Sequence, residues 1–425
     1  MSAEESRATY LLVGGGLAVS RAVEGIRSLD QSGSIVLVTE EERLPYERPP
    51  LSKAALKGDD PVESAFTHEE SWYTANHVDV RLGDPATSLD AATSAVTLHD
   101  GAVVGYDKLL IATGSSARAL EVPGADLEGV LYLRRMPEST ALRARFASGH
   151  RLVIVGAGWI GLEVAAAAVD AGCQVTVVEP QPSPLFGVLG PQIGGWFAEL
   201  HRSHGVQFQF GEGVERLAGE GQVTGVVTKS GQTLAADTVV VGVGISPNTG
   251  LAEVAGLAVD NGIVTDSSLR SSDRQVWAAG DVASWLSPTL ETHVRVEHWA
   301  NANDGGYAAG RIMAGSNEVY DPIPFFFSDQ YDVGLEYAGY VPRGTDTELV
   351  VRGDLASNEF MAFWVVPADG SADGSATGAG EVRVLAGMHV NVWDTIDAVQ
   401  QLVRDRTTVK RNKLADPDVA LTDLT

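Results

Sequence analysis

Two glycine-rich turns in this chain have the residue types and the spacing that hold a dinucleotide. The first is Val13–Val19, with the sequence VGGGLAV, and the second is Val155–Gly161, with the sequence VGAGWIG. Each follows an apolar run suited to a strand, opens a run suited to a helix, and precedes a second apolar run that ends in an acid, Glu40 or Glu179. The glycines permit a tight turn and a close approach of the backbone to a pyrophosphate, and the acid binds ribose hydroxyls. Two such motifs predict two dinucleotides, most simply a flavin and a nicotinamide, and a protein that holds both transfers electrons.

The first turn departs from the pattern at Val19, where a third glycine or an alanine is expected. That third small residue lets the helix and the strand pack closely. Val19 either widens the contact between helix and strand or loosens the hold on the first dinucleotide, and the sequence leaves both open. We predict that a Val19→Gly variant holds this dinucleotide at least as tightly as the parent.

The elements that must position these turns are indicated by the apolar runs around them. Residues 103–111 predict a strand that stops at the small residues 112–114, and residues 238–243 predict a strand with a similar exit at 244–248. Because both nucleotide units end alike, we expect an internal duplication of the βαβ plan. A further strand, 276–283, contains a Gly-Asp pair.

The remaining segments indicate a connecting loop and a smaller domain. Residues 45–53 form a proline-punctuated loop that leads into a predicted helix. After Pro324 apolar and polar residues alternate, as in 331–340 and 360–366, which predicts strands of an α+β domain. Residues 367–380 have the composition of a flexible loop between two of these strands, and we expect no function in them.

Length and cysteine content limit the class of protein. A chain of 425 residues is too long for one core and suggests two or three domains. The single cysteine, Cys173, excludes a disulfide framework and an internal redox dithiol, and we interpret it as a small packing residue in a protein of a reducing compartment. No apolar stretch has the length of a transmembrane helix and residues 1–7 are not signal-like, so we expect a soluble, cytoplasmic protein. No metal site is expected.

The charge balance bears on the partners. A formal net charge of −26 argues against nucleic acid and against an anionic membrane as partners. One basic segment stands out near the C-terminus and is the best candidate for a local dock that receives an acidic protein, the alternative being a solvated helix end. Its basic residues are Arg404, Arg406, Lys410, Arg411 and Lys413.

A series of motifs resembles one known family along nearly the whole chain. It is the FAD-dependent, NAD(P)H-oxidising ferredoxin reductases of the putidaredoxin, rubredoxin and rhodocoxin reductase type, which belong to the pyridine nucleotide-disulfide oxidoreductases but lack the redox dithiol. Monodehydroascorbate reductase and apoptosis-inducing factor are relatives. The matching motifs are ERPPLSK at 47–53, ATGS at 112–115, GAGWIGLE at 156–163, GVGISPN at 242–248, AGDVA at 279–283 and SDQYD at 328–332.

The resemblance implies an α/β fold with two Rossmann-like dinucleotide-binding domains, arranged as in glutathione reductase, and a C-terminal α+β domain. It places a discontinuous FAD domain at 1–113 and 248–327, an NADH domain at 114–247, and the C-terminal domain at 328–425. A monomer is expected by analogy.

The resemblance also assigns two catalytic residues. Lys53 would place a positive charge near the reactive nitrogen N5 of the flavin, where a fixed cation stabilises the reduced ring. Glu163 would be its partner. The alternatives are that Lys53 begins an exposed helix and that Glu163 is an acid stabilised by the positive end of a helix.

Further residues are expected to hold FAD. Arg48 would meet the phosphates or the ring edge, unless it is a surface arginine, and Asp281 would accept a hydrogen bond from the ribitol, unless it caps a helix. Trp299 would lie beside the pyrimidine end, unless it is a core tryptophan, and Phe327 stands where several relatives have a tryptophan. The FAD set is Gly14, Gly16, Glu40, Arg48, Lys53, Ala112, Thr113, Gly114, Asp281, Trp299 and Phe327.

The second turn is expected to hold the nicotinamide dinucleotide. Glu179 favours NADH over NADPH, because a carboxylate repels a 2′-phosphate and residues 180–183 offer no arginine to bind one. Trp159 would cover the flavin and move aside for the nicotinamide, the alternative being ordinary packing. The NAD set is Gly156, Gly158, Trp159, Ile160, Gly161, Glu179 and Gly244.

The predicted function is that of an NADH-dependent ferredoxin reductase that serves an oxygenase. A hydride would pass from NADH to FAD, and single electrons would pass on to a small iron–sulfur protein. Two alternatives remain open. One is a reductase of a small molecule such as a quinone or an ascorbyl radical, and the other is a non-catalytic role like that of apoptosis-inducing factor.

Overall fold

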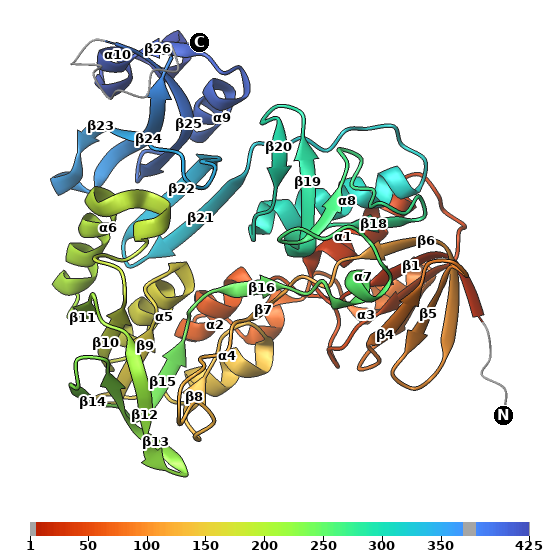
Figure 1. Ribbon diagram of the computed structural model, residues 1–425, viewed down its shortest axis with the longest axis horizontal. Coiled ribbons are helices and arrows are strands. Elements are labelled where there is room, and N and C mark those ends of the chain that lie inside the picture. The colour runs from red at the N-terminus through yellow and green to blue at the C-terminus, as the bar shows by residue number, and fades with distance from the viewer. Residues whose placement is uncertain (1–5, 369–379, 425) are drawn as a thin grey trace. The chain divides into compact units, whose positions relative to one another are not determined.

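The computed structural model describes residues 6–368 and 380–424, and these divide into two compact units (Figure 1). The first unit contains the chain up to Leu44, residues 68–114, and the chain from Thr249 onward. The second contains residues 45–67 and 115–248. The chain therefore passes between the units four times, and each unit is described by itself below.

The first unit is built on a seven-stranded sheet with the strand order β3-β2-β1-β6-β5-β4 and with β18 beside β6. Strands β3, β2, β1, β6 and β18 are parallel to one another, whereas β5 is antiparallel to both β6 and β4. The central strands are continuous apolar runs because they are buried on both faces, and Leu11 and Leu12 are fully buried. The strands are β1 (Ser6–Val13), β2 (Ile35–Val38), β3 (Val78–Arg81), β4 (Ala86–Asp90), β5 (Ala95–Leu98), β6 (Val103–Ile111) and β18 (Val276–Ala278).

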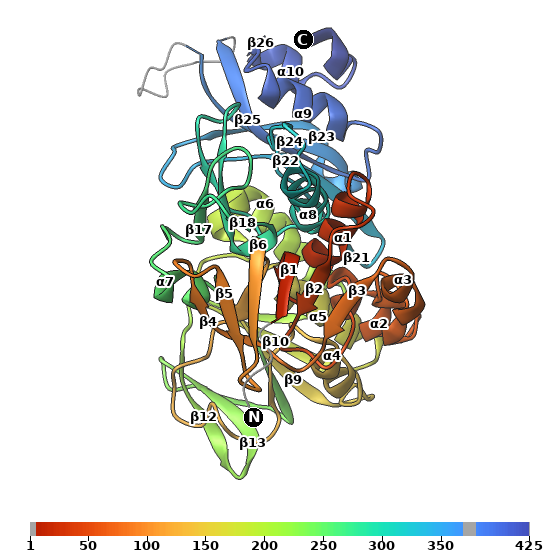
Figure 2. The ribbon, with the colours of Figure 1, turned by 90° about the vertical axis from the view of Figure 1, so that its right-hand side faces the viewer.

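Helix α1 (Leu17–Arg27) follows the first glycine turn and lies alongside α8 (Trp299–Met313) (Figure 2). Glycines allow this close approach: a Cβ added to Gly306 would lie 2.3 Å from the carbonyl oxygen of Ala18, and one added to Gly310 would lie 2.1 Å from that of Ala22. Any larger residue at these two positions would push the helices apart.

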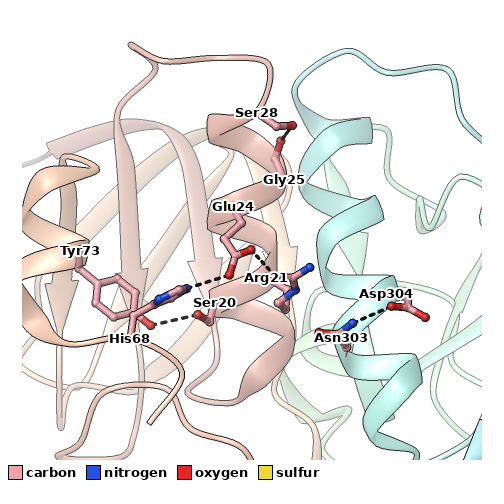
Figure 3. A network of polar contacts seen from close by, with 9 residues as sticks. All are labelled: Ser20, Arg21, Glu24, Gly25, Ser28, His68, Tyr73, Asn303 and Asp304. Atoms are coloured by element: carbon pink, nitrogen blue, oxygen red, sulfur yellow. Dashed lines mark hydrogen bonds and ion pairs between the residues drawn. The ribbon is translucent and has the colours of Figure 1, made fainter.

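A polar network on α1 holds the chain where it re-enters the first unit (Figure 3). The ring nitrogen Nε2 of His68 lies 2.8 Å from Oε1 of Glu24, which also forms an ion pair with Arg21. The hydroxyl of Tyr73 donates to that of Ser20 at 3.2 Å. His68 and the following α3 (Glu70–Ala75) are thereby attached to α1.

The C-terminal part of the first unit is a six-stranded antiparallel sheet with the order β21-β22-β25-β24-β23 and with β26 beside β25. Helix α9 (Ile396–Arg404) covers one face and buries Val399, Leu402 and Val403 in a common core with β24 and β25. The strands are β21 (Phe325–Gln330), β22 (Val333–Gly339), β23 (Glu348–Asp354), β24 (Glu359–Pro367), β25 (Glu381–Val390) and β26 (Thr408–Lys410), and the short α10 (Arg411–Ala415) follows.

Small elements complete the first unit. They are α7 (Gly250–Val254), β17 (Ile263–Thr265), the 3₁₀ helix η3 (Gly280–Val282), β19 (Ala283–Ser287), β20 (Thr292–Val294), η4 (Leu355–Ser357) and η5 (Leu421–Leu424). Strands β17, β19 and β20 form a sheet of three.

The second unit repeats the plan of the first sheet. Its five parallel strands have the order β11-β10-β9-β15-β8, so the strand before the glycine turn again lies between the strand that ends in the acid and the strand with the small-residue exit. The predicted duplication is therefore confirmed. The elements of this sheet are β8 (Val130–Leu131), α4 (Met136–Arg143), β9 (Arg151–Val155), α5 (Trp159–Asp170), β10 (Gln174–Glu179), α6 (Phe186–Ser203), β11 (Gln207–Phe210) and β15 (Thr238–Val241).

The other elements of the second unit lie at its edges. Strands β12 (Val214–Glu220), β13 (Gln222–Thr228) and β14 (Thr233–Ala235) form an antiparallel sheet, and β7 (Ser115–Ala117) pairs with β16 (Ile245–Pro247). The segment 45–67 adds η1 (Pro49–Ser52), α2 (Ala54–Lys57) and η2 (Val62–Ala65).

The α/β fold with two Rossmann-like domains and a C-terminal α+β domain is confirmed. Element boundaries differ slightly from the prediction: β22 begins at Val333 rather than at residue 331, because Tyr331 has a φ of 57° in the turn after β21. Of the predicted flexible loop 367–380, residues 369–379 lie outside the described residues. In the part of the chain that the structure describes, no helix is long and apolar enough to cross a membrane.

Candidate functional site

The second glycine turn requires its glycines for steric reasons. Gly156 has a φ of 103°, and a Cβ there would lie 2.3 Å from the carbonyl oxygen of Gly242. A Cβ on Gly161 would lie 2.3 Å from the carbonyl oxygen of Gly156, so this third glycine permits the contact between α5 and the turn. A Cβ on Gly158 would meet no atom within 4 Å. The turn therefore leaves space above Gly158, at the N-terminus of α5, where a phosphate would lie.

Glu179 lies at the end of β10, beside this turn. Its Oε2 accepts a hydrogen bond from the backbone N–H of Ala157 at 2.8 Å, and its Oε1 accepts one from the N–H of Gln181 at 2.9 Å. These bonds hold the carboxylate at the edge of the sheet. In that place it can accept from ribose hydroxyls and repel a 2′-phosphate.

Apolar side chains surround the second turn. Ile160 and Val243 are 44% and 37% exposed, which is unusual for large apolar residues that are not at a chain end. They follow β9 and β15, two adjacent parallel strands, and therefore lie at the same edge of the sheet. Trp159 packs edge-on against Phe197 at 5.6 Å, and Gly244 has a φ of 102°. This edge offers an apolar surface to a flat ring.

Lys53 and Glu163 form an ion pair within the second unit. The Nζ atom of Lys53 lies 2.7 Å from Oε1 of Glu163, and the hydroxyl of Ser52 donates to Oε2 at 2.5 Å. Glu163 is only 6% exposed, and these two donors help to compensate its burial. Lys53 does not begin an exposed helix: its side chain is 17% exposed and turned to the carboxylate. Ser52 was not nominated from the sequence, although it precedes Lys53 in the motif.

Arg48 also has partners within the second unit. Its Nη1 donates to the carbonyl oxygen of Arg134 at 2.5 Å, and its guanidinium lies 5.2 Å from the ring centre of Tyr46. These contacts hold Arg48 against α4 and the loop before it. It is therefore an anchored side chain rather than a loose surface arginine.

The first glycine turn has the same geometry apart from Val19. Gly14 has a φ of 148°, and a Cβ there would lie 2.2 Å from the carbonyl oxygen of Ala112, whereas a Cβ on Gly16 would meet nothing within 4 Å. Val19 is fully buried and its Cγ2 lies 3.0 Å from the position of a Cβ on Gly14. The valine side chain thus packs against the turn at Gly14, while the space beside Gly16 stays open.

Part of the predicted FAD set lies at the same sheet edge as this turn. In the register of the parallel strands, Val13 of β1 is opposite both Val38 of β2 and Ile111 of β6, and Ile111 is opposite Ala278 of β18. The residues that follow these four strand ends are therefore neighbours. They are Gly14 and Gly16, Glu40, the run Ala112-Thr113-Gly114, and Asp281.

Trp299 and Phe327 meet within the first unit. Their ring centres are 6.4 Å apart and their planes are at 69°, so the two rings meet edge to face. Trp299 is the first residue of α8, Phe327 lies on the edge strand β21, and neither is fully buried. Neither ring is therefore a simple core residue.

The arginines of the basic C-terminal segment already have partners. Arg411 pairs with Glu348, Arg406 pairs with Glu291, and Arg404 donates to the carbonyl oxygen of Asp321. Lys410 and Lys413 are exposed. The segment is less positive at its surface than the sequence suggests.

The buried cysteine agrees with a packing role. Burial raises the pKa of the Cys173 thiol, and its Sγ lies 3.5 Å from the carbonyl oxygen of Ala147. A thiol with a raised pKa is a poor nucleophile at neutral pH.

Comparison with known proteins gives the family. A family model described as pyridine nucleotide-disulphide oxidoreductase matches residues 8–306. The chain belongs to this family. A second model, described as reductase C-terminal, matches residues 325–425.

The relatives match over nearly the full length. The anthranilate 1,2-dioxygenase system ferredoxin–NAD(+) reductase component of Burkholderia cepacia is 37% identical over 415 residues, which are 97% of this chain and 98% of that protein. Rhodocoxin reductase of Rhodococcus erythropolis is 41% identical over 84% of this chain and 83% of that protein. The crystal structure of the covalent putidaredoxin reductase–putidaredoxin complex superposes with a TM-score of 0.91 at 33% identity and covers 99% of this chain and 98% of that chain. The suspected family resemblance is confirmed.

The residues present fit FAD and NADH, the two cofactors that the family implies. Each glycine turn has an open position at the start of its helix, Gly16 or Gly158, and an acid at the end of the next strand, Glu40 or Glu179. Open glycines admit two pyrophosphates, and the acids suit two riboses.

Proposed function

We propose that this protein is an FAD-dependent NADH:ferredoxin oxidoreductase, which oxidises NADH and passes single electrons to a small iron–sulfur protein of an oxygenase system. The presence of two complete dinucleotide sites, one in each unit, carries the proposal. Bound FAD supplies the step from a two-electron donor to a one-electron acceptor. Because the chain has one cysteine, no internal dithiol can relay the electrons, and the acceptor must take them from the flavin directly.

We propose these roles for the chain's own residues. Lys53, held by Glu163, would supply a fixed cation that stabilises the reduced flavin. Asp281 would accept a hydrogen bond from the ribitol, the run Ala112–Gly114 would contribute to the FAD site, and Arg48 would meet the phosphates or the ring edge. Trp299 and Phe327 would lie beside the ring, and Trp159 would cover it and move aside for the nicotinamide.

We assign the dinucleotides to parts of the chain as follows. FAD is held by residues 1–113 and 248–327, NADH by residues 114–247, and residues 328–425 form the domain that covers the flavin. The matched sheet plans and the match of a C-terminal model to residues 325–425 support this division. Preference for NADH follows from Glu179.

The ferredoxin docks near the basic segment at the C-terminus, with Lys410 and Lys413 as the principal contacts. These two are exposed, whereas Arg406 and Arg411 form ion pairs with Glu291 and Glu348. Arg404 is also exposed, and its bond to the neutral carbonyl oxygen of Asp321 leaves its charge in place. We further propose a monomer that works in the cytoplasm. Sedimentation of the FAD-loaded protein tests the monomer.

Acceptor profiling tests the function. Purified protein loaded with FAD should reduce cytochrome c slowly with NADH, and the rate should rise at least tenfold when a [2Fe–2S] ferredoxin is added. NADPH should be a much poorer donor. If a quinone is reduced rapidly and ferredoxin makes no difference, the acceptor is a small molecule and the proposal is wrong.

A further inference from the structure

Arg295 lies at a junction that none of the roles above uses. It directly follows β20, which is antiparallel to β19, with Val294 opposite Trp285. Strand β19 begins directly after η3, the 3₁₀ helix that contains Asp281. The pairing of these two strands therefore brings Arg295 close to η3.

The buried side chain of Arg295 joins two segments through one nitrogen atom. Its Nη1 donates to the backbone carbonyl oxygen of Asp281 at 3.2 Å and to Oε1 of Glu297 at 2.8 Å. The side chain of Arg295 is 8% exposed, and that of Glu297 is 33% exposed. Because a buried cation needs a compensating charge, the ion pair with Glu297 allows the guanidinium to lie beside η3.

Gly262 leaves room for the stem of this side chain. A Cβ added to Gly262 would lie 2.7 Å from Cδ of Arg295 and 2.8 Å from the carbonyl oxygen of Val282. The next residue, Ile263, begins β17 and is opposite Ala283, the first residue of β19. Close packing thus limits the positions that the guanidinium can take.

Both segments that Arg295 joins lead to the proposed FAD site. Asp281 is the proposed acceptor of a hydrogen bond from the ribitol, and it follows Gly280, which has a φ of 75°. Glu297 lies two residues before Trp299, the first residue of α8. A bond to the carbonyl oxygen of Asp281 itself restricts the backbone from which the Asp281 carboxylate projects.

We infer that Arg295 is a positioning residue for FAD: its bond to the Asp281 carbonyl oxygen holds η3 in the orientation in which the Asp281 carboxylate accepts from the ribitol. The inference rests on the proposed function for the presence of FAD. Arg295 acts through Asp281, so its loss should lower the affinity for FAD only while the Asp281 carboxylate is present.

A double-variant cycle tests this dependence. Arg295→Met keeps an apolar stem and removes the donor, and Asp281→Asn removes the charge of the carboxylate at nearly the same size. Each single variant should raise the Kd for FAD about tenfold. The double variant should bind no more than about twofold more weakly than the weaker single variant, whereas independent effects would multiply to about a hundredfold. Equilibrium dialysis of FAD against the four proteins measures these values, and circular dichroism checks that each is folded.

Two further variants serve as controls. Arg311→Met is the matched control, because Arg311 also lies in the first unit and pairs with a glutamate, Glu318, at 3.0 Å. It should leave the Kd for FAD near that of the parent. Arg295→Lys keeps a cationic nitrogen with N–H groups for both bonds and should recover most of the affinity that Arg295→Met loses. In FAD-saturated protein, KM for NADH should be the same in the Arg295 variants as in the parent.

The outcomes distinguish this inference from the proposed function. A parent-like Kd in folded Arg295→Met would overturn the positioning role, and so would multiplying effects in the double variant or an equal loss in Arg311→Met. If Arg295→Met does not fold, Arg295→Gln takes its place in the same cycle and is judged in the same way. If the parent itself binds no FAD, the proposed function is wrong, and the role of Arg295 is overturned with it.

Discussion

At the scale of single residues, the chemistry depends on a carboxylate that the fold hides from water. Glu163 lies in α5 and accepts hydrogen bonds from Lys53 and Ser52, which belong to a segment more than a hundred residues away in sequence. Removing one partner of a buried ion pair strongly destabilises a protein, whereas replacing both partners can be nearly neutral. The ion pair is therefore a structural requirement, apart from the catalytic role that we propose for it.

Loss of Lys53 alone should destabilise the protein more than loss of both charges of the ion pair. Lys53→Met removes the cation beside the buried Glu163 and should destabilise the protein by about 3 kcal/mol. The double variant Lys53→Met/Glu163→Gln should recover much of that loss, although neither should reduce the flavin at the parent rate. Thermal unfolding measures the first effect and stopped-flow absorbance the second. The control is Lys57→Met, whose ion pair with Asp170 is longer, at 3.6 Å, and more exposed; stability changes equal to those of Lys53→Met would contradict the argument.

Acid should destabilise the fold through His298. The folded-state pKa of about 4 lies below the ordinary value near 6.5, so below about pH 6.5 the unfolded chain binds a proton that the folded chain does not. The stabilisation is complete above about pH 6.5 and is lost as the pH falls towards 4. Comparison of melting temperatures between pH 7 and 4.5 should therefore show a smaller fall for His298→Gln than for the parent. His293→Gln, which replaces an exposed histidine, is the control. If it reduces the fall in melting temperature equally, the effect does not come from His298.

At the scale of elements, α1 is confined on both sides. Val19 fills the contact with the glycine turn, while Gly306 and Gly310 of α8 bring a second helix against its other face. The irregular third position of the first fingerprint is thus a packed core position rather than a gap. Whether it weakens FAD binding is a separate question from its effect on stability.

Val19→Gly should lower stability. It deletes a fully buried side chain and puts glycine in a helix, which together destabilise by about 3 kcal/mol. Val19→Ala shortens the side chain without placing a glycine in the helix. Its stability should therefore lie between those of the parent and of Val19→Gly. Equilibrium dialysis of FAD against all three proteins then tests the separate prediction that the glycine variant holds FAD at least as tightly. An unchanged melting temperature in Val19→Gly would show that the helix shifts to fill the space.

Local patterns determined what could be predicted from the sequence. The glycine turns, their acids and the strand exits were recognisable because each depends on a few adjacent residues, and the register of the parallel strands then places them at one edge. Lys53 and Glu163 could be paired only through the family resemblance, since nothing local relates them. The ring contacts of Trp299 with Phe327 and of His298 with Phe326 were not predictable, because they depend on how an edge strand meets the end of a distant helix.

At the scale of the whole molecule, a net charge of −26 must be reconciled with an electron acceptor that can itself be acidic. Long-range repulsion slows such an encounter at low salt, unless a local positive surface receives the partner. The sequence indicated five basic residues for that surface, and the ion pairs of Arg406 and Arg411 reduce it to Lys410, Lys413 and Arg404. The dock is therefore expected to be small.

Charge reversal at the dock should affect the ferredoxin alone. Lys410→Glu/Lys413→Glu should raise KM for ferredoxin about tenfold at low ionic strength, with the difference shrinking in salt, and should leave NADH-dependent ferricyanide reduction unchanged. The control Arg216→Glu/Lys229→Glu makes the same change in net charge at exposed positions of the second unit. If both double variants raise KM for ferredoxin alike, the effect comes from the net charge of the protein and there is no local docking surface.

The four passages of the chain between the units come in two pairs, and each pair is tied together. Thr67 donates to the carbonyl oxygen of Pro45 through its N–H at 3.1 Å and its hydroxyl at 2.9 Å. Strand β7 pairs with β16, so that Ser115 is opposite Pro247. The two ends of residues 115–248 thus begin and finish side by side.

A segment whose ends lie side by side can be inserted into another protein, since that protein need only offer two neighbouring chain ends to join it. If this segment holds NADH as we propose, exchange of residues 115–248 could change the nicotinamide preference without redesign of the sheet in the first unit. The exchanged segment would, however, contain Glu163 without Lys53 and Ser52, the two residues that bond to its carboxylate. Any host that accepts the graft must offer its own ERPPLSK-like loop, or the glutamate must first become neutral.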